Sequence, residues 1–224
     1  MIGYVEITTW RDFVRKLAYA SLFVALTWAA QADSFGTENA RLPPVADQPS
    51  DPIVAAIFEG IRRRGAEPLN MHKTLAYSPK VFKAYVDLAY ALRASAKVPR
   101  IYRELIILRT AQLSHGDYEL AQHGPMALSC GISKTQLGEI EQWKTSSLFD
   151  AKQRSVLAYA DAMARFDGVD DATYEALSQN FDAQEIVELT LTAAFYEGVS
   201  RTTRTLRIPI EESTRDQKTQ YGNC

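Results

Sequence analysis

Two acidic residues and one histidine have the types and the spacing of an acid–base site. Glu119 and His123 are four residues apart in the stretch GDYELAQH, so on a helix they share one face. Glu104 lies just upstream in the apolar stretch RELIILRTAQL, and Gly116 indicates a tight elbow between two helices. If these helices pack antiparallel, the three side chains converge in a partly dry pocket. Such an environment shifts the pKa values of the three groups apart, so that one group acts as an acid and another as a base near neutral pH.

Three further residues could contact a substrate. Tyr118 or Tyr196 could donate a hydrogen bond to an oxyanion that develops during a reaction. Arg201, near the end of the sequence, could hold a substrate carboxylate through a bidentate contact. The alternatives are a surface or intersubunit salt bridge for Arg201 and a place in the core for Tyr196.

The acid–base interpretation has two competitors. A Glu–His pair at this spacing is often only a solvated or capping pair, and Glu104 then pairs with Arg103 or Arg109. The same spacing also suits two metal ligands. The sequence offers no second such pair, and His72 alone gives little support, so we expect no metal.

Composition restricts the class of protein. The chain has 224 residues, 46% of them hydrophobic and 23% charged, which is typical of one soluble globular domain. The net charge is −2 and there is no polybasic run, so nucleic acid is not an expected partner. The two cysteines, Cys130 and Cys224, form no CxxC pair and no zinc pattern.

The sequence divides into four parts. Residues 1–32 are predicted to be a signal peptide, because an uncharged stretch, 17–32, follows basic residues and ends in a small-x-small pattern. Residues 33–50 are typical of an extended arm, residues 51–211 of a helical domain, and residues 212–224 of a polar tail. A cleaved leader implies an exported protein, periplasmic or secreted, without a stable membrane anchor. An uncleaved amphipathic helix or a start codon assigned too early implies a cytoplasmic one.

The domain is predicted to be all-α. Apolar residues recur with helical spacing, and no convincing alternating strand pattern is present. Proline, serine or aspartate stands at most of the expected helix starts. The expected helices cover residues 52–63, 80–96, 100–115, the elbow helix from 116, 134–143, 151–166, a short helix from 170 or 171, and 183–206.

Two long stretches resemble a known family. RELIILRTAQLSHGDYELAQHGPMALSCGISKTQLGEI resembles the signature of the carboxymuconolactone decarboxylase family, and EIVELTLTAAFYEGVSRTTRTLRIPIE resembles its closing helix. The likeness runs from about Ala40 to Glu211 and is strongest at 99–140 and 183–211. It implies the helical fold of the alkylhydroperoxidase-D-like (AhpD-like) proteins, which form the redox branch of the family.

The redox branch carries CxxCxxxH at the elbow, and this sequence departs from that pattern. The histidine matches His123 and the relay glutamate matches Glu104, but the two cysteine positions fall on Gly116 and Glu119. Cys130 comes seven residues after His123 and is no substitute. A thiolate is the nucleophile of that chemistry, so thiol peroxidase activity is not expected.

The decarboxylase branch is similar to this sequence in keeping the Glu and His without the cysteines. It implies cofactor-independent loss of CO2 from a small carboxylated lactone in aromatic catabolism. In this reaction His123 would be the general acid or base, Glu119 its partner or a second acid, and Glu104 a relay. The resemblance also implies a homo-oligomer, a trimer or hexamer.

Other functions remain open at this point. The same residues could serve an isomerase, a lactonase or a dehydratase that acts on a similar small molecule. A non-enzymatic alternative is an oligomeric binding protein in which Glu104, Glu119 and His123 only satisfy one another.

Overall fold

The described part of the chain consists of helices and their connections. The computed structural model describes residues 40–165 and 167–211, and within these ranges it contains no strand, so the prediction of an all-α fold is confirmed. The helices are α2 (Pro52–Arg63), α3 (Asn70–Leu75), α4 (Pro79–Tyr90) with a π-helical turn (Ala91–Ser95), α5 (Arg100–Leu113), α6 (Asp117–Ser129), α7 (Lys134–Glu139), α8 (Ala151–Met163), α9 (Asp171–Ser178) and α10 (Ala183–Leu206).

Most helices begin where a side chain can cap them. The side chains of Asp51, Asp150 and Asp182 accept hydrogen bonds from the first N–H groups of α2, α8 and α10. These N–H groups have no partner inside a helix. Ser133 and Gln136 form the predicted capping box at the start of α7. The sequence-based starts of these helices are therefore confirmed.

Helix α3 was not predicted. It is only six residues long, and its N-cap is Leu69, whose side chain cannot accept a hydrogen bond. The side chain of His72 replaces the usual cap, because its Nδ1 atom accepts the backbone N–H of Leu69 at 3.0 Å. A short helix that is capped from its own third residue leaves little trace in the sequence.

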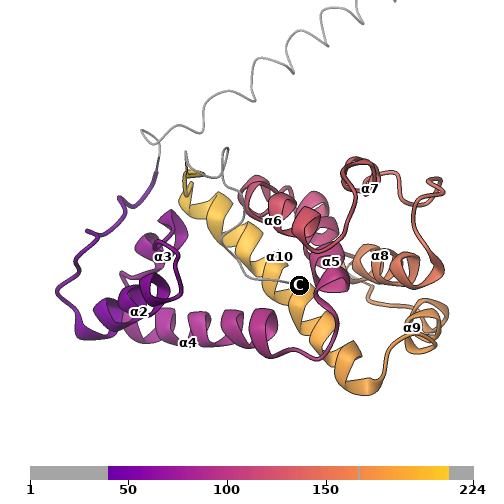
Figure 1. Cartoon of the computed structure of the whole chain (residues 1–224), viewed down its shortest axis with the longest axis horizontal. Helices are drawn as coiled ribbons and strands as arrows, with labels where there is room; N and C mark the ends of the chain where they lie inside the picture. The colour runs from indigo at the N-terminus through magenta and orange to yellow at the C-terminus, as the bar shows by residue number, and fades with distance from the viewer. Residues whose placement is uncertain (1–39, 166, 212–224) are drawn as a thin grey trace, which may run out of the picture. The chain divides into compact units, whose positions relative to one another are not determined.

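Helix α5 is the centre of the bundle. Its residues 103–111 are all buried, so every face of the helix is covered. Helices α6, α8 and α10 pack against it (Figure 1). Leu105 of α5, Leu157 of α8 and Leu189 of α10 meet in the main core. Charged side chains on such a helix need partners, because burial of an unpaired charge is costly.

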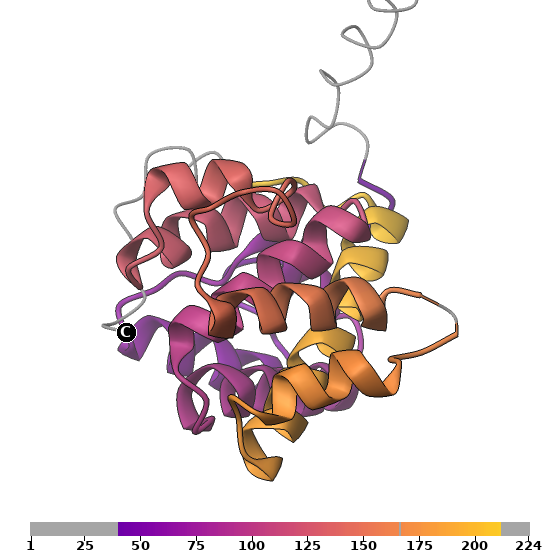
Figure 2. The same cartoon turned by 90° about the vertical axis from the view of Figure 1, so that its right-hand side faces the viewer.

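A smaller core holds the N-terminal helices together. Phe58 of α2 and Phe82 of α4 contact edge to face, with ring centroids 6.3 Å apart. Helices α2, α3 and α4 lie on one side of α5 and α10, and α8 and α9 lie on the other (Figures 1 and 2). Tyr85 of α4 stacks on Phe195 of α10 with centroids 4.8 Å apart. Side chains from α3, α4, α6 and α10 therefore share one internal space.

The predicted boundaries at both ends fall partly outside the described residues. The predicted signal peptide 1–32, the first part of the predicted arm and the predicted tail 212–224 lie outside them. The described part of the arm, residues 40–50, has no helix and touches the bundle. The N–H of Val45 donates to the carbonyl oxygen of Lys73 at 3.3 Å. Among the described helices, none is both long and apolar enough to cross a membrane.

Candidate active site

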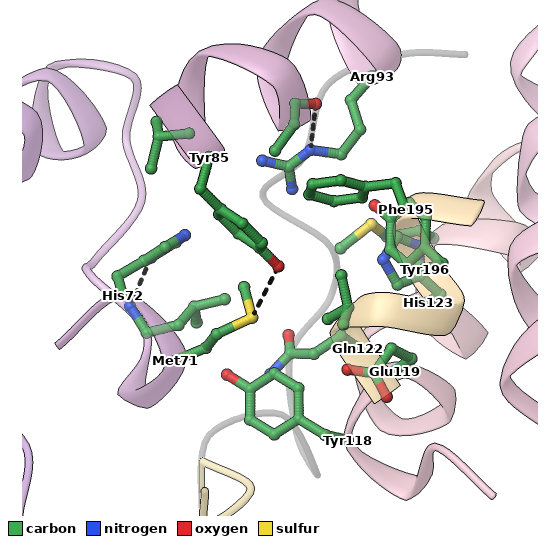
Figure 3. Close-up of a pocket in the computed structure, with 15 residues that line it drawn as sticks. Met71, His72, Tyr85, Arg93, Tyr118, Glu119, Gln122, His123, Phe195 and Tyr196 are labelled. Carbon is green, nitrogen blue, oxygen red and sulfur yellow. Dashed lines mark hydrogen bonds between the residues drawn. The ribbon is translucent and has the colours of Figure 1, made fainter. Parts of the chain in front are cut away.

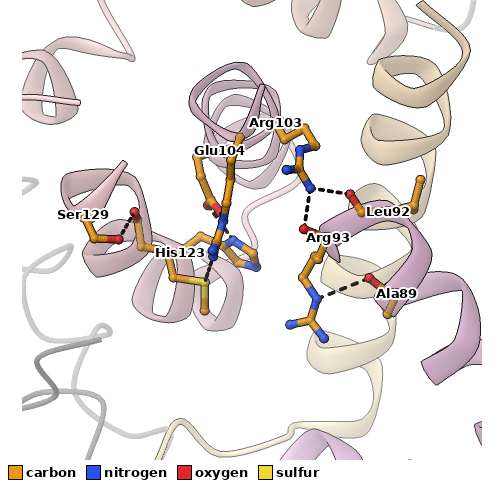
Figure 4. Close-up of polar contacts among 9 residues, drawn as sticks. Ala89, Leu92, Arg93, Arg103, Glu104, His123 and Ser129 are labelled. Atoms are coloured by element: carbon orange, nitrogen blue, oxygen red, sulfur yellow. Dashed lines mark hydrogen bonds and ion pairs between the residues drawn. The ribbon is translucent and has the colours of Figure 1, made fainter. Parts of the chain in front are cut away.

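Glu104 of α5 and His123 of α6 form a buried pair. Oε2 of Glu104 and Nδ1 of His123 are 2.8 Å apart (Figure 4), and the two residues are 1% and 4% exposed. Arg100 donates from Nε to Oε1 of Glu104 at 3.1 Å. Burial by itself raises the pKa of Glu104, but the charges and hydrogen bonds of His123 and Arg100 outweigh it and lower that pKa. Glu104 is therefore a carboxylate.

This pairing determines which nitrogen of His123 can react. An ionised carboxylate only accepts hydrogen bonds, so the hydrogen-bond network assigns a proton to Nδ1 of His123. Nε2 is then the atom that gains or loses a proton. No described residue makes a hydrogen bond to Nε2. The ring of Tyr196 packs edge to face on the ring of His123, with centroids 4.8 Å apart, and restricts its rotation.

Glu119 lies one turn before His123 in a contrasting environment. It is 1% exposed, and its Oε1 atom accepts a 3.3 Å hydrogen bond from Oγ1 of Thr203. Within the described residues, Oε2 of Glu119 has no hydrogen-bond partner, and neither has Oγ of Ser200. Burial raises the pKa of Glu119, and nearby hydroxyl and backbone groups only partly offset it. The two glutamates therefore have pKa values shifted in opposite directions.

Gly116 makes room for this arrangement at the elbow. A Cβ atom on Gly116 would lie 2.5 Å from Oε2 of Glu119 and 2.9 Å from Cβ of Ser200, and would overlap Oγ of Ser200. These separations are far below van der Waals contact. The elbow glycine is therefore required by the close approach of α6 and α10, and any side chain there would displace Glu119.

Glu119 and His123 line a pocket between the N-terminal helices and the α6–α10 pair (Figure 3). The free space measures about 40 Å³, which is room for a few water molecules. A ring-shaped ligand would need some lining side chains to move. The other lining residues include Met71, His72, Tyr85, Arg93, Tyr118, Gln122, Met126, Phe195 and Tyr196.

The structure brings together some of the predicted site residues and separates others. The partner of His123 is Glu104, and not Glu119 as one interpretation of the spacing had it. Tyr196 lines the pocket, and burial raises the pKa of its hydroxyl to about 12, so it stays a hydrogen-bond donor. Tyr118 also lines the pocket, but its hydroxyl donates to Oε1 of Glu211 at 2.7 Å and is already engaged.

Arg201 is not part of this pocket. Its guanidinium is exposed on α10, and Nη2 donates to Oε1 of Glu197 at 2.6 Å. This contact is a surface salt bridge, which was the alternative prediction for Arg201. The spacing of residues along α10 could not distinguish a pocket position from a surface position for Arg201, because spacing does not determine how the helix is rotated towards its neighbours.

Several pocket residues were not predicted as site residues, and His72 and Arg93 are the two that carry basic groups. His72 was considered only as a possible metal ligand, and the helix that carries it was not predicted. Arg93 comes four residues after Ala89 and seven after Val86, both of which also line the pocket. A lone charge on the apolar face of a predicted helix was the available signal. Among the described residues, no three His, Cys, Asp or Glu side chains gather in a way that could hold a metal ion.

Comparisons with known proteins agree with this architecture. Residues 79–162 match the model of the carboxymuconolactone decarboxylase family. No curated protein matches the chain. An uncharacterized peroxidase-related protein from Silicibacter sp. TM1040 is 22% identical with a TM-score of 0.67, and the match covers 82% of this chain and all of that one.

Two further solved structures share the fold. One is an uncharacterized peroxidase-related protein from Ralstonia eutropha JMP134, described as an alkylhydroperoxidase AhpD core, which is 20% identical with a TM-score of 0.68. That match covers 78% of this chain and 94% of the other. The other is the debrominase Bmp8, 17% identical with a TM-score of 0.66, and the match covers 81% and 96% of the two chains. Over residues 79–162 the chain is thus similar to the carboxymuconolactone decarboxylase family, and its fold is that of the AhpD-like proteins.

Proposed function

We propose that the protein is an enzyme that removes CO2 from a small carboxylated lactone, or a closely related carbonyl compound, by acid–base chemistry without a cofactor. The observation that carries the proposal is the buried Glu104–His123 pair at a pocket that Glu119 also lines. The family match over residues 79–162 supports a catalytic role on a small molecule.

The proton transfer follows from the pairing of His123. Loss of CO2 leaves an electron pair on the ring carbon, delocalised into the lactone carbonyl as a dienolate. The His123 imidazolium donates its Nε2 proton to that carbon, and the proton on Nδ1 stays hydrogen-bonded to Glu104. The carboxylate of Glu104 stabilises the imidazolium and fixes its orientation. Solvent then returns one proton to Nε2, so the net reaction consumes one proton and releases one CO2.

The dienolate oxygen needs hydrogen-bond donors. Burial raises the pKa of Glu119, and in its protonated form this residue can donate through a carboxylic O–H. The Tyr196 hydroxyl is the second donor, because it lines the pocket and keeps its proton. Donors that are already in place where negative charge develops stabilise the transition state more than the substrate.

Thiol chemistry is not part of the proposal. The positions that match the two cysteines of the redox branch hold Gly116 and Glu119. Cys130 lies at the C-terminal end of α6, away from the start of that helix, where the pocket residues Tyr118 and Glu119 lie.

A paired assay on the purified protein tests the proposal. One arm supplies γ-carboxymuconolactone and measures CO2 release, and the other supplies an alkyl hydroperoxide with a reducing system. We expect turnover in the first arm only, and its loss in His123→Ala. His115→Asn is the matched control, because His115 is exposed and has a positive φ of 55° that asparagine tolerates.

The outcomes separate the alternatives. Hydroperoxide turnover, or lactone turnover that persists in His123→Ala, would overturn the proposal. Ring opening, isomerisation or dehydration without CO2 release would keep the acid–base site but replace the decarboxylation. No turnover of any small carbonyl compound would favour the non-catalytic binding protein.

A further inference from the structure

Arg93 presents an unoccupied pair of donors to the pocket. Its Nε atom donates to the carbonyl oxygen of Ala89 at 3.3 Å, which is the one hydrogen bond that Arg93 donates to described residues (Figure 4). No carboxylate among the described residues forms an ion pair with it. Arg93 lines the pocket beside Tyr85 and Phe195 (Figure 3). Its terminal nitrogens are therefore available to a ligand.

The backbone that carries Arg93 is held from the core. Arg103, which is buried on α5, donates from Nη1 to the carbonyl oxygens of Leu92 and Arg93 at 2.7 and 2.6 Å (Figure 4). These carbonyls belong to the π-helical turn that follows α4, where regular α-helical hydrogen bonding ends. π-helical turns often occur at functional sites. The turn is thus fixed by the same helix that carries Glu104.

His72 supplies a second donor on the same wall. Its Nδ1 accepts from the backbone N–H of Leu69, so the neutral ring carries its proton on Nε2. Burial, reinforced by the positive charges of Arg93 and Arg64, lowers the pKa of His72 to about 3. The ring is therefore an uncharged hydrogen-bond donor at neutral pH.

The pocket thus has two chemically different walls. His123 and Glu119, the acid–base groups, come from α6, whereas Arg93 and His72, both donors, come from the N-terminal helices. We propose that Arg93 binds a carboxylate group of a small flat ring substrate through its terminal nitrogens, with Nε2–H of His72 as a neighbouring donor. A guanidinium matches a carboxylate in shape and charge.

This inference rests on the proposed function and assigns a substrate-binding role to Arg93. An ion pair to the carboxylate that leaves would stabilise the substrate more than the transition state, because its charge moves into the ring as CO2 departs. The carboxylate that Arg93 holds must therefore be one that stays in the product.

Binding measurements with simple probes test the role of Arg93 without any turnover. Calorimetric titration of the full chain with 2-furoate and with its neutral analogue 2-furamide compares a ring carboxylate with an uncharged isostere. We expect furoate to bind at least about tenfold more tightly than furamide, as for a charge-assisted hydrogen bond. Arg93→Gln should remove that preference and leave furamide binding unchanged, and Arg93→Lys should restore part of it.

Arg201→Gln is the matched control, because it removes an arginine from the exposed surface. Equal binding of the two probes, no binding of either, or a preference that survives Arg93→Gln would overturn the assignment. Circular dichroism of each variant checks the fold. If lactone turnover depends on His123 but furoate affinity does not change in Arg93→Gln, only this inference fails. If furoate binding depends on Arg93 but no carbonyl compound is turned over, only the proposed function fails.

Discussion

Glu104 and His123 contact each other across 19 positions of sequence, through a 2.8 Å hydrogen bond between two side chains that are almost fully buried. One comes from the most enclosed helix of the bundle and the other from the helix after the elbow. A buried histidine held by an ionised carboxylate has one defined tautomer and one reactive nitrogen.

Replacing Glu104 with glutamine should impair catalysis more than folding. The amide keeps the size of the side chain but can present its N–H₂ group to His123, which favours the wrong tautomer. We expect kcat for the proposed decarboxylation to fall by about 10²- to 10⁴-fold, as in other enzymes with a carboxylate-held histidine. The assay is steady-state CO2 release, with the thermal midpoint as a check on folding. Unchanged kcat in a folded variant would mean that the pair is structural.

Glu119 should make activity and stability depend on pH in a defined direction. Its folded-state pKa is raised, so its contribution to stability is present below the unfolded-state pKa and is lost as pH rises through the folded-state value. Glu119→Gln removes this dependence, so the variant should gain stability relative to the wild type as pH increases. Denaturant unfolding at a series of pH values measures the difference.

The same shifts predict a bell-shaped rate profile. Activity should decrease on the acid side as Glu104, whose pKa is lowered, takes up a proton, and on the alkaline side as Glu119 loses one. Glu119→Gln should lack the alkaline limb that this residue contributes. A variant whose pH profiles of stability and rate both match the wild type would show that Glu119 is not the titrating group.

Gly116→Ala tests the close approach at the elbow. The added methyl group meets Glu119 and Ser200, so we expect a loss of about 1–3 kcal/mol in unfolding free energy from overpacking. Gly138→Ala is the control, because nothing lies within 4 Å of its added Cβ on α7. That change should be neutral or stabilising by up to about 1 kcal/mol. Equal effects of the two substitutions on stability would argue against a steric overlap of the added methyl group at position 116 with Glu119 and Ser200.

Arg103→Met should weaken both the fold and the proposed binding of a carboxylate by Arg93. Two carbonyl groups of the π-helical turn lose their donor, at a cost of about 2–4 kcal/mol. Furoate binding should weaken as well, because the turn that positions Arg93 is released. Arg63→Met removes an exposed ion pair with Glu59 and should change stability by less than about 0.5 kcal/mol. A destabilised variant with unaltered furoate affinity would show that the π-helical turn does not need Arg103 in order to position Arg93 for ligand binding.

The exposed apolar side chains of α4 and α10 predict self-association. Val81 and Leu88 are 67% and 44% exposed, and Val187 and Leu191 are 56% and 48% exposed. Light scattering should give a mass at least twice that of the chain, and Val81→Lys combined with Val187→Lys should reduce it. Tyr174→Lys on α9 is the control. A wild-type monomer at micromolar concentration would contradict the prediction.

The sequence predicted the parts of the fold that depend on local chemistry. Helix starts at Asp51, Asp150 and Asp182 could be recognised because the capping side chain lies next to the N–H groups that it satisfies. The π-helical turn could not, because apolar spacing continues through it and its carbonyls are bound by Arg103 from another helix. A contact of this kind exists only after the chain has folded.

In the candidate site, too, features set by the local sequence could be predicted, and features set by tertiary contacts could not. The convergence of Glu104 and His123 was predictable, because two consecutive helices joined by a tight elbow have few ways to pack. Spacing could not predict that Arg201 lies on the surface and Arg93 in the pocket, since this depends on how α4 and α10 are rotated in the bundle. The role of His72 as a donor could not be predicted from the sequence either. Its neutral state with one N–H donor comes from burial and from its hydrogen bond with Leu69.

The crowding at Gly116 also limits which substitutions the elbow can accept one at a time. A cysteine introduced at position 116 would push its side chain into Ser200 and Glu119. A thiol at this position would therefore need α10 to change first or at the same time. The effects of substitutions at positions 116, 119 and 200 thus depend on one another, which is epistasis with a direct steric cause.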